Sequence, residues 1–320
     1  MVDDLTGSID ARPRTLRPLV TTVLDGGLAT ELEARGHDLS DRLWSARVLL
    51  TEPDAIEDVH LAYFRAGAGV ATTASYQATV PGFVAAGLDQ AGALGAIARS
   101  VELARRARDR HADEAGLDPS ELLLAGSVGP YGAMLADGSE YRGDYDPGEA
   151  VLREVHAPRI EALLAAGVDV LALETIPTMR EAAVLLDLVT AAGARAWLSY
   201  QCRDGASTAA GEPLAEAVAL ADGRPGIVAV GVNCTAPRHV SSLLEAAASA
   251  TDLPLIAYPN GGDRWNAADR RWISGDAAGA YQPDTVATWT DLGATWLGGC
   301  CGTGPSEIRA LADALGARAA

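Results

Sequence analysis

The stretch from Val168 to Cys202 reads VDVLALETIPTMREAAVLLDLVTAAGARAWLSYQC. It opens with a short, nearly continuous apolar run (168–177), continues through a segment of helical period (180–193) and returns to a second apolar run (195–202). Apolar runs without alternation are typical of strands that are buried on both faces. The stretch therefore predicts a strand, a helix and a second, parallel strand, because parallel neighbours need such a crossover.

The same alternation extends over the rest of the chain. Further short apolar runs occupy residues 21–26, 69–77, 122–130, 226–234, 253–260 and 294–301. Alanine-rich segments of helical period lie between them. Eight strand–helix units in 320 residues predict the fold class: α/β, a single (β/α)₈ TIM-type barrel. An open, doubly wound sheet is the alternative.

Composition narrows the classes of function. The net charge of −18 argues against nucleic acid as a partner, because phosphate binding needs clustered basic residues. No apolar run is long enough for a membrane span, and the N-terminus lacks the apolar core of a secretory signal, so we expect a cytoplasmic protein. Lysine is absent, which excludes Schiff-base chemistry on lysine and a Walker-type phosphate loop.

The chain shows no linker-like shift in composition that would divide it into several domains. Residues 1–18 are polar and of mixed charge, and we expect them to form a loosely ordered N-terminal extension. Residues 19–320 then form the barrel domain.

Polar residues follow six of the eight predicted strands, and in a barrel these strand ends meet at one mouth. The six groups are Asp25-Gly26-Gly27, Ser75-Tyr76-Gln77, Glu174-Thr175, Asn233-Cys234, Tyr258-Pro259-Asn260 and Gly298-Gly299-Cys300-Cys301. Two long connections, residues 130–147 and 260–283, open on the same face. Each is expected to be either a substrate lid or mobile decoration.

Three of the four cysteines stand at predicted strand ends. Cys234 ends one strand, and Cys300 and Cys301 follow another between glycines 298, 299 and 302, which let the backbone bend toward one ion. Three thiolates with one open position are typical of a catalytic Zn²⁺ site, one ion per chain. Cys202 lacks such a setting and is expected to pack in the core. The alternative is that all of them are inert, buried thiols.

Such a site favours one kind of chemistry. Three thiolates make zinc a poor generator of hydroxide but leave room for a fourth thiolate, supplied by a substrate. Coordination deprotonates a thiol that would otherwise stay protonated near neutral pH. The sequence thus indicates activation of a substrate thiol for alkyl transfer.

Five segments of the chain resemble the homocysteine S-methyltransferase family. They are LDGGLATELEARG (24–36), TASYQAT (73–79), AGSVGPYGAMLADGSEYRGDY (125–145), GVNC (231–234) and GGCC (298–301). The likeness runs from about residue 20 to 315 and is greatest for members that use S-methylmethionine or S-adenosylmethionine. It implies a zinc-dependent barrel that methylates L-homocysteine to L-methionine.

The resemblance also implies roles for individual residues. Cys234, Cys300 and Cys301 correspond to the zinc ligands, and Asp25 and Glu174 to residues that bind the homocysteine amine. The backbone of Gly26, Gly27 and Leu28 corresponds to the place that holds the substrate carboxylate.

The residues themselves leave alternatives open. Asp25 suits an ammonium ion but also a simple cap on the following helix, and Glu174 suits an ammonium ion or a buried ion pair with an arginine. Ser75, Tyr76 and Asn233 are further substrate-binding candidates at strand ends. No histidine falls at a strand end, consistent with a reaction that needs no general base.

The second substrate is expected to be a sulfonium methyl donor, held by carboxylates and aromatic faces. Candidate aromatic residues in or beside the rim loops are Trp44, Tyr76, Tyr131, Tyr141, Trp265 and Trp272. Rival functions are methylation of selenocysteine or selenohomocysteine at the same site, and a non-catalytic barrel with a structural zinc or a redox-sensing thiol. The sequence fixes neither the donor nor the oligomeric state.

Overall fold

Eight parallel strands form a closed barrel in the computed structural model, which describes residues 21–39, 45–262, 264–266, 271–273 and 281–316. The order around the sheet is β1-β10-β7-β6-β5-β4-β3-β2, and a parallel bridge between Leu24 and Val70 joins its two edges. This closure confirms the barrel and excludes the open sheet. The strands are β1 (Thr22–Val23), β2 (Val70–Thr72), β3 (Leu123–Val128), β4 (Val170–Ile176), β5 (Ala196–Tyr200), β6 (Ile227–Asn233), β7 (Leu255–Tyr258) and β10 (Ala294–Leu297).

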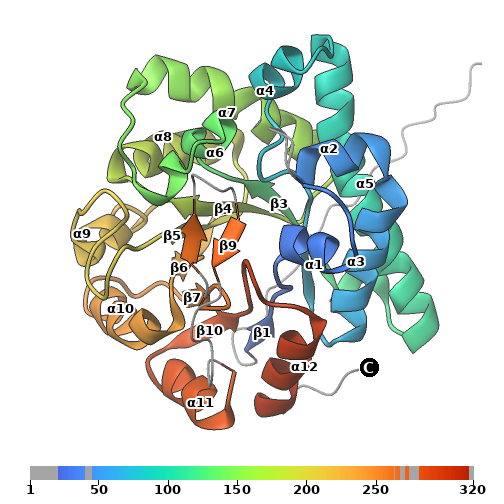
Figure 1. Cartoon of the computed structure of the whole chain (residues 1–320). Coiled ribbons are helices and arrows are strands. Elements are labelled where there is room, and N and C mark those ends of the chain that lie inside the picture. The colour runs from blue at the N-terminus through green and yellow to red at the C-terminus, as the bar shows by residue number, and fades with distance from the viewer. Residues whose placement is uncertain (1–20, 40–44, 263, 267–270, 274–280, 317–320) are drawn as a thin grey trace, which may run out of the picture.

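Helices surround the barrel as an outer ring (Figure 1). Each predicted apolar run contains one strand of the barrel, and at least one helix follows every strand. The helices are α1 (Leu28–Ala34), α2 (Ser45–Thr51), α3 (Pro53–Arg65), α4 (Val80–Ala85), α5 (Gln90–Ala115), α6 (Tyr131–Leu135), α7 (Gly148–Ala165), α8 (Met179–Ala192), α9 (Leu214–Ala219), α10 (Val240–Ala248), α11 (Pro283–Asp291) and α12 (Pro305–Ala314).

Two hydrophobic layers hold the fold together. The larger lies between the strands and the helices, and the smaller fills the inside of the barrel. Two tryptophans, Trp197 and Trp296, have ring centres 5.8 Å apart in the inner layer, where the small residues Ala125, Ala172 and Ala229 leave them room. Mixing large and small inward side chains in this way fills a barrel without voids.

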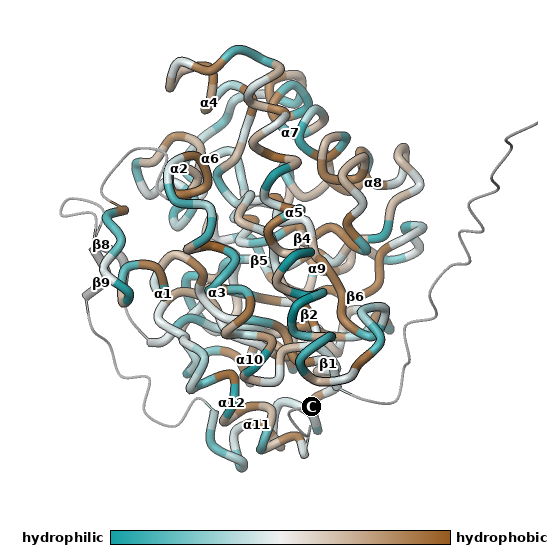
Figure 2. The backbone as a smooth tube through the Cα atoms, turned by 90° about the vertical axis from the view of Figure 1, so that its right-hand side faces the viewer, coloured by the Kyte–Doolittle hydropathy of each residue, from teal (hydrophilic) through white to brown (hydrophobic). Residues whose placement is uncertain are grey.

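The two long connections differ in how far they can be described. Residues 130–147 contain α6 and a 3₁₀ turn, η2 (Ser139–Tyr141), and the Gln77 side chain donates to the Ala133 carbonyl at 2.9 Å. In residues 260–283 a hairpin of β8 (Arg264–Asn266) and β9 (Arg271–Ile273) is described. It lies in front of the barrel in Figure 1 and beside α1 at the edge of the molecule in Figure 2. It therefore stands at the end of the barrel where the strands finish.

The predicted N-terminal extension, residues 1–18, lies outside the described residues. Within the described part of the chain, none of the helices combines the length and the apolar character that crossing a bilayer requires.

Candidate metal and substrate site

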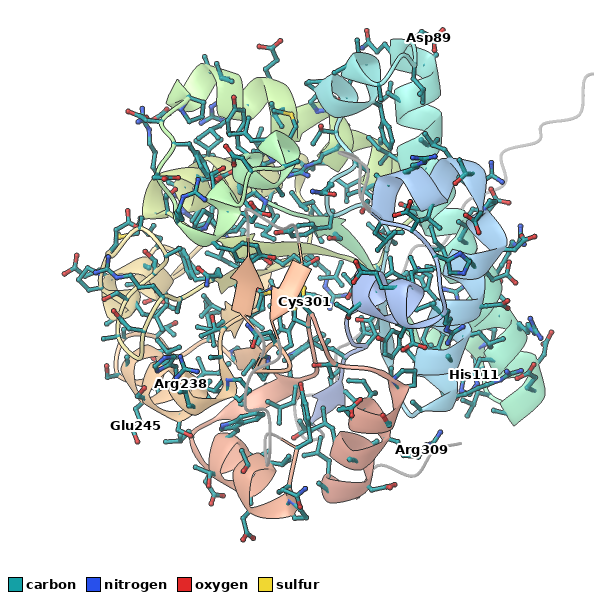
Figure 3. The ribbon with its side chains drawn as sticks, in the orientation of Figure 1. Asp89, His111, Arg238, Glu245, Cys301 and Arg309 are labelled. Atoms are coloured by element: carbon teal, nitrogen blue, oxygen red, sulfur yellow. The ribbon has the colours of Figure 1, made fainter. Side chains whose placement is uncertain are left out.

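The three predicted metal ligands meet at the mouth of the barrel. The sulfur atoms of Cys234, Cys300 and Cys301 all lie within 4.8 Å of one another, although two barrel strands, two helices and the 260–283 connection separate Cys234 from the other two along the chain. Figure 3 labels Cys301 near the centre of the ring of helices, beside the β8–β9 hairpin. Cys234 and Cys301 are buried, and Cys300 is partly exposed.

Backbone geometry fixes the direction of these side chains. Cys234 has a φ of 46°, a left-handed conformation that is uncommon outside glycine, and its amide donates to the Tyr258 carbonyl at 3.1 Å. The Cys300 amide donates to the Pro259 carbonyl at 2.8 Å. Both cysteine segments are thus anchored on the end of β7. Strain of this kind in non-glycine residues persists where the surrounding structure holds it, often at functional sites.

Glycines 298, 299 and 302 serve the turn in two different ways. Only Gly302 has a positive φ, at 76°, where a side chain would be strained. A Cβ at Gly298 would lie 2.5 Å from Leu24 Cβ, and one at Gly299 would lie 2.1 Å from a Thr303 methyl carbon. Gly298 and Gly299 are therefore required by close packing, whereas the sequence had suggested that all three serve the bend.

The sulfur cluster fits a tetrahedral metal ion. Zinc–sulfur bonds of about 2.3 Å at tetrahedral angles would place sulfurs about 3.8 Å apart. The Cys234 and Cys301 sulfurs are 3.8 Å apart. The cluster can therefore hold a metal with little rearrangement. Cys202 is buried away from it, and burial raises the pKa of its thiol, as suits a packing residue.

Asp25 follows β1 and is almost fully buried beside the sulfur cluster. Its carboxylate accepts the Thr72 amide at 2.7 Å and the Thr72 hydroxyl at 2.8 Å. It is not the cap of the next helix, because Gly27 occupies the N-cap of α1 without a side-chain cap. Burial, with a smaller contribution from the charge of Glu174, raises the pKa of Asp25 to about 8, although the hydrogen bonds from Thr72 act in the opposite direction.

Glu174 lies on β4 and faces the same pocket. It accepts a hydrogen bond from the Ser127 hydroxyl, and among the described residues it forms no ion pair with an arginine. Burial, with a smaller contribution from Cys300, raises its pKa to about 8. Two buried carboxylates without a bound cation repel each other, and a single ammonium ion between them would relieve both.

One pocket joins the cysteines and the carboxylates. The residues that line it are Asp25, Gly26, Gly27, Leu28, Ala29, Thr72, Thr73, Ala74, Tyr76, Ser127, Tyr141, Glu174, Thr175, Cys234, Tyr258, Gly299, Cys300 and Cys301. Most of the predicted site residues are in this set. None of the five histidines lines the pocket, in agreement with their predicted positions away from the strand ends.

Ser75 and Asn233 are buried behind the pocket wall. The Ser75 hydroxyl donates to the Ser127 carbonyl at 2.7 Å, so it supports β3. Asn233 is fully buried, and its side chain binds Thr175.

In the backbone of Gly26, Gly27 and Leu28, which is predicted to hold the substrate carboxylate, one amide already has a partner within the protein. The Gly27 amide donates to the Thr303 carbonyl at 2.9 Å, and a Cβ at Gly27 would lie 2.6 Å from the Cys300 carbonyl oxygen. Gly27 therefore packs the start of α1 closely against the turn of residues 298–303 that carries Cys300 and Cys301. Leu28 and Ala29, at the start of α1, line the pocket and present the amides of the first helical turn, which have no partner within a helix.

The predicted aromatic residues divide into three groups. Tyr76 and Tyr141 line the pocket, and Tyr131 instead packs on Tyr145 with ring centres 5.5 Å apart. The side chains of Trp44, Trp265 and Trp272 lie outside the described residues.

Several pocket residues were not chosen from the sequence. Tyr258 stands in a predicted strand end, and Thr72 and Ser127 are polar residues inside apolar runs, which is a usable signal for an inward-facing polar group. Tyr141, which the sequence offered only as an aromatic candidate for the donor, comes from η2 in the long connection after β3 and hydrogen-bonds the Cys234 sulfur. Its neighbour Glu140 is buried, and burial raises its pKa to about 7.

The raised pKa of Asp25 predicts a pH-dependent cost in stability. The Asp25 carboxyl keeps its proton up to about pH 8 in the folded protein, but only up to its ordinary pKa of 3.8 in the unfolded chain. Its contribution to the stability of the folded state is therefore fully present below pH 3.8. That stabilisation is lost as the pH rises to about 8. Asp25→Asn should therefore melt above the native protein at pH 8.5, and the gap should shrink at pH 5. Thermal unfolding of the metal- and substrate-free proteins measures this, and a gap independent of pH would contradict the shift.

Comparisons with known proteins agree with this site. Residues 22–315 match the homocysteine S-methyltransferase family. The chain is 49% identical to the homocysteine S-methyltransferase of Escherichia coli (strain K12) over 90% of this chain and 93% of that protein. It is 40% identical to the selenocysteine Se-methyltransferase of Brassica oleracea var. italica, over 92% and 89% of the two chains.

A solved structure shares the fold. The metallated form of the homocysteine methyltransferase MmuM from Escherichia coli superimposes with a TM-score of 0.82 at 48% sequence identity, covering 91% of this chain and 95% of that chain. The family match over residues 22–315 spans all eight strands of the barrel, including the strand ends that carry the cysteines and the two carboxylates. On these grounds the chain belongs to the homocysteine S-methyltransferase family, whose members are methyltransferases.

Proposed function

We propose that this methyltransferase is zinc-dependent and transfers a methyl group from a sulfonium donor, S-methylmethionine or S-adenosylmethionine, to L-homocysteine, giving L-methionine. The observation that carries the proposal is the meeting of three cysteine sulfurs and two buried carboxylates in one pocket. A substrate with a thiol at one end and an ammonium at the other matches that arrangement.

Cys234, Cys300 and Cys301 would hold the metal, and their soft sulfur atoms favour zinc over magnesium or calcium. Bound there with one position open, zinc would deprotonate the substrate thiol and keep its sulfur nucleophilic. The protein contributes by fixing the three sulfurs in advance, through the strained backbone at Cys234 and the packed glycines of the cysteine turn.

Asp25 and Glu174 orient the amino acid. An ammonium between the two carboxylates makes charge-assisted hydrogen bonds and removes their mutual repulsion. The first-turn amides at Leu28 and Ala29 suit the substrate carboxylate, because a helix N-terminus carries partial positive charge. With both ends held, the substrate sulfur points to the cysteines.

Tyr76 and Tyr141 line the pocket near the cysteines and suit a cationic donor. In the reaction the homocysteine sulfur attacks the methyl carbon of the sulfonium. A new carbon–sulfur bond forms, the old one breaks with its electron pair on the departing sulfur, and a neutral thioether leaves. The thiol proton goes to solvent. Loss of the positive charge weakens the aromatic contacts, which aids product release.

A second acceptor is supported by a specific comparison. One relative at 40% identity is a selenocysteine Se-methyltransferase. A selenol is more acidic and softer than a thiol, so the same pocket suits it. We therefore include selenocysteine and selenohomocysteine as candidate acceptors.

A panel of donors and acceptors tests the proposed function. Purified, zinc-loaded protein is incubated with L-homocysteine and each of S-methylmethionine, S-adenosylmethionine and betaine, and methionine is quantified. We expect methionine from at least one sulfonium and none from betaine, which is an ammonium donor. Selenocysteine replaces homocysteine in a parallel series. Methionine from betaine alone would contradict the sulfonium assignment.

A further inference from the structure

The carboxamide of Asn233 joins the two halves of the site. Asn233 ends β6, directly before the metal ligand Cys234, and is fully buried. Its Oδ1 accepts the Thr175 amide at 2.6 Å and the Ser199 hydroxyl at 2.9 Å. Its Nδ2 donates to the Thr175 hydroxyl at 2.8 Å and lies 4.0 Å from the Cys300 sulfur. Because the Thr175 amide can only donate, the orientation of the carboxamide is determined.

Thr175 needs this support. Its φ of 60° is left-handed, which disfavours a β-branched residue, and it directly follows Glu174. The pairing of β4 with β5 is irregular between Leu173 and Ile176, so the regular hydrogen bonds between these strands do not hold the backbone at Thr175 in place. Two hydrogen bonds between Thr175 and Asn233 hold it instead: the Thr175 amide donates to Oδ1 and Nδ2 donates to the Thr175 hydroxyl, so β6 supports β4 past the intervening β5. The direction of the Glu174 carboxylate therefore depends on Asn233.

The other side of the carboxamide faces the metal ligands. An N–H group directed at a cysteine sulfur orients a thiolate and stabilises its negative charge, as other groups behind metal ligands do. Asn233 also places Cys234, the next residue in the chain, whose own φ is positive. One side chain thus contacts the backbone beside the carboxylate and lies behind one metal-binding sulfur.

We propose that Asn233 is a positioning residue that couples the metal-binding sulfurs to the carboxylate that binds the substrate ammonium. This rests on the proposed zinc and homocysteine function. The two ends of the carboxamide have separate roles: Oδ1 holds the backbone at Thr175, directly after Glu174, and Nδ2 supports the Cys300 sulfur.

Three variants test the coupling. Asn233→Asp keeps an oxygen for the Thr175 amide but puts negative charge near Cys300, so zinc affinity should fall about 10- to 100-fold, with less effect on the KM for homocysteine. Asn233→Ala loses both contacts and should weaken zinc binding and raise that KM. Thr175→Gly removes the backbone strain at this position, so adding Asn233→Ala to it should raise the KM by a smaller factor than in the native background.

Zinc affinity is measured by competition with a chelator, and kcat and KM by methionine formation at saturating zinc. Thermal unfolding checks that each variant folds. Asn233→Ala with native zinc affinity and native KM would overturn the proposal, as would an equal rise in KM with and without Thr175→Gly. A native protein that binds no zinc would overturn the proposed function, and this role with it.

Discussion

Cys301→Ala is expected to lose zinc and methyl transfer together while the barrel stays folded. Zinc bound by four protein ligands has a binding free energy of about 10–16 kcal/mol, so one thiolate accounts for about 3–4 kcal/mol, or about 10²- to 10³-fold in affinity. The Cys301 side chain lies at the mouth and is not part of either hydrophobic layer, so its loss should leave the core intact.

Cys202→Ala is the matched control for this prediction. Cys202 is equally a buried cysteine near a strand end, but its sulfur is not part of the cluster. We expect this variant to keep one zinc per chain and native turnover, with a modest loss of stability. Zinc content by metal analysis and methionine formation are measured on both variants. Full zinc and full turnover in Cys301→Ala would contradict the assigned ligands.

Glu174→Gln is expected to raise the KM for homocysteine about 10- to 100-fold and to lower kcat, with a small change in the KM of the methyl donor. A hydrogen bond to a charged group contributes about 1.5–3 kcal/mol, and the amide keeps the size of the side chain but not its charge. The variant also leaves Asp25 as the single carboxylate for the ammonium. Glu174 makes no ion pair with an arginine among the described residues, but the charge of the buried Arg159 on α7 lowers its pKa, so the change also removes that weaker interaction.

Ser127→Ala provides the comparison for Glu174→Gln. The Ser127 hydroxyl donates to Glu174, so its removal loosens the carboxylate without removing the charge. We expect a smaller rise in the homocysteine KM than for Glu174→Gln. Initial rates with each substrate varied in turn separate the two KM values. An unchanged homocysteine KM in Glu174→Gln would remove Glu174 from the ammonium site.

The barrel and the sulfur cluster could be predicted from the sequence because they rest on local patterns. A strand buried on both faces has an apolar run, and the residues that end such runs must meet at one mouth once the barrel is known. Cys234, Cys300 and Cys301 each end or follow such a run, so the topology alone brings them together. Glu174 was found by the same reasoning.

Contacts that depend on strand neighbours far apart in sequence could not be predicted. The Asp25 carboxylate turns to Thr72 because β1 and β2 close the barrel, and no local pattern distinguishes that from a helix cap. Tyr141 reaches the cysteines along a connection whose path follows no periodicity. The role proposed for Asn233 depends on a left-handed Thr175 and an irregular strand pairing, and neither leaves a signal in the residue types.

X-ray absorption at the zinc edge tests the central claim most directly. The zinc-loaded protein is measured alone and with saturating L-homocysteine. We predict three sulfur neighbours without substrate and four with it, at about 2.3 Å. Four sulfur neighbours in both states, or three sulfurs unchanged by saturating homocysteine, would contradict a metal site that keeps one position open for the substrate thiol.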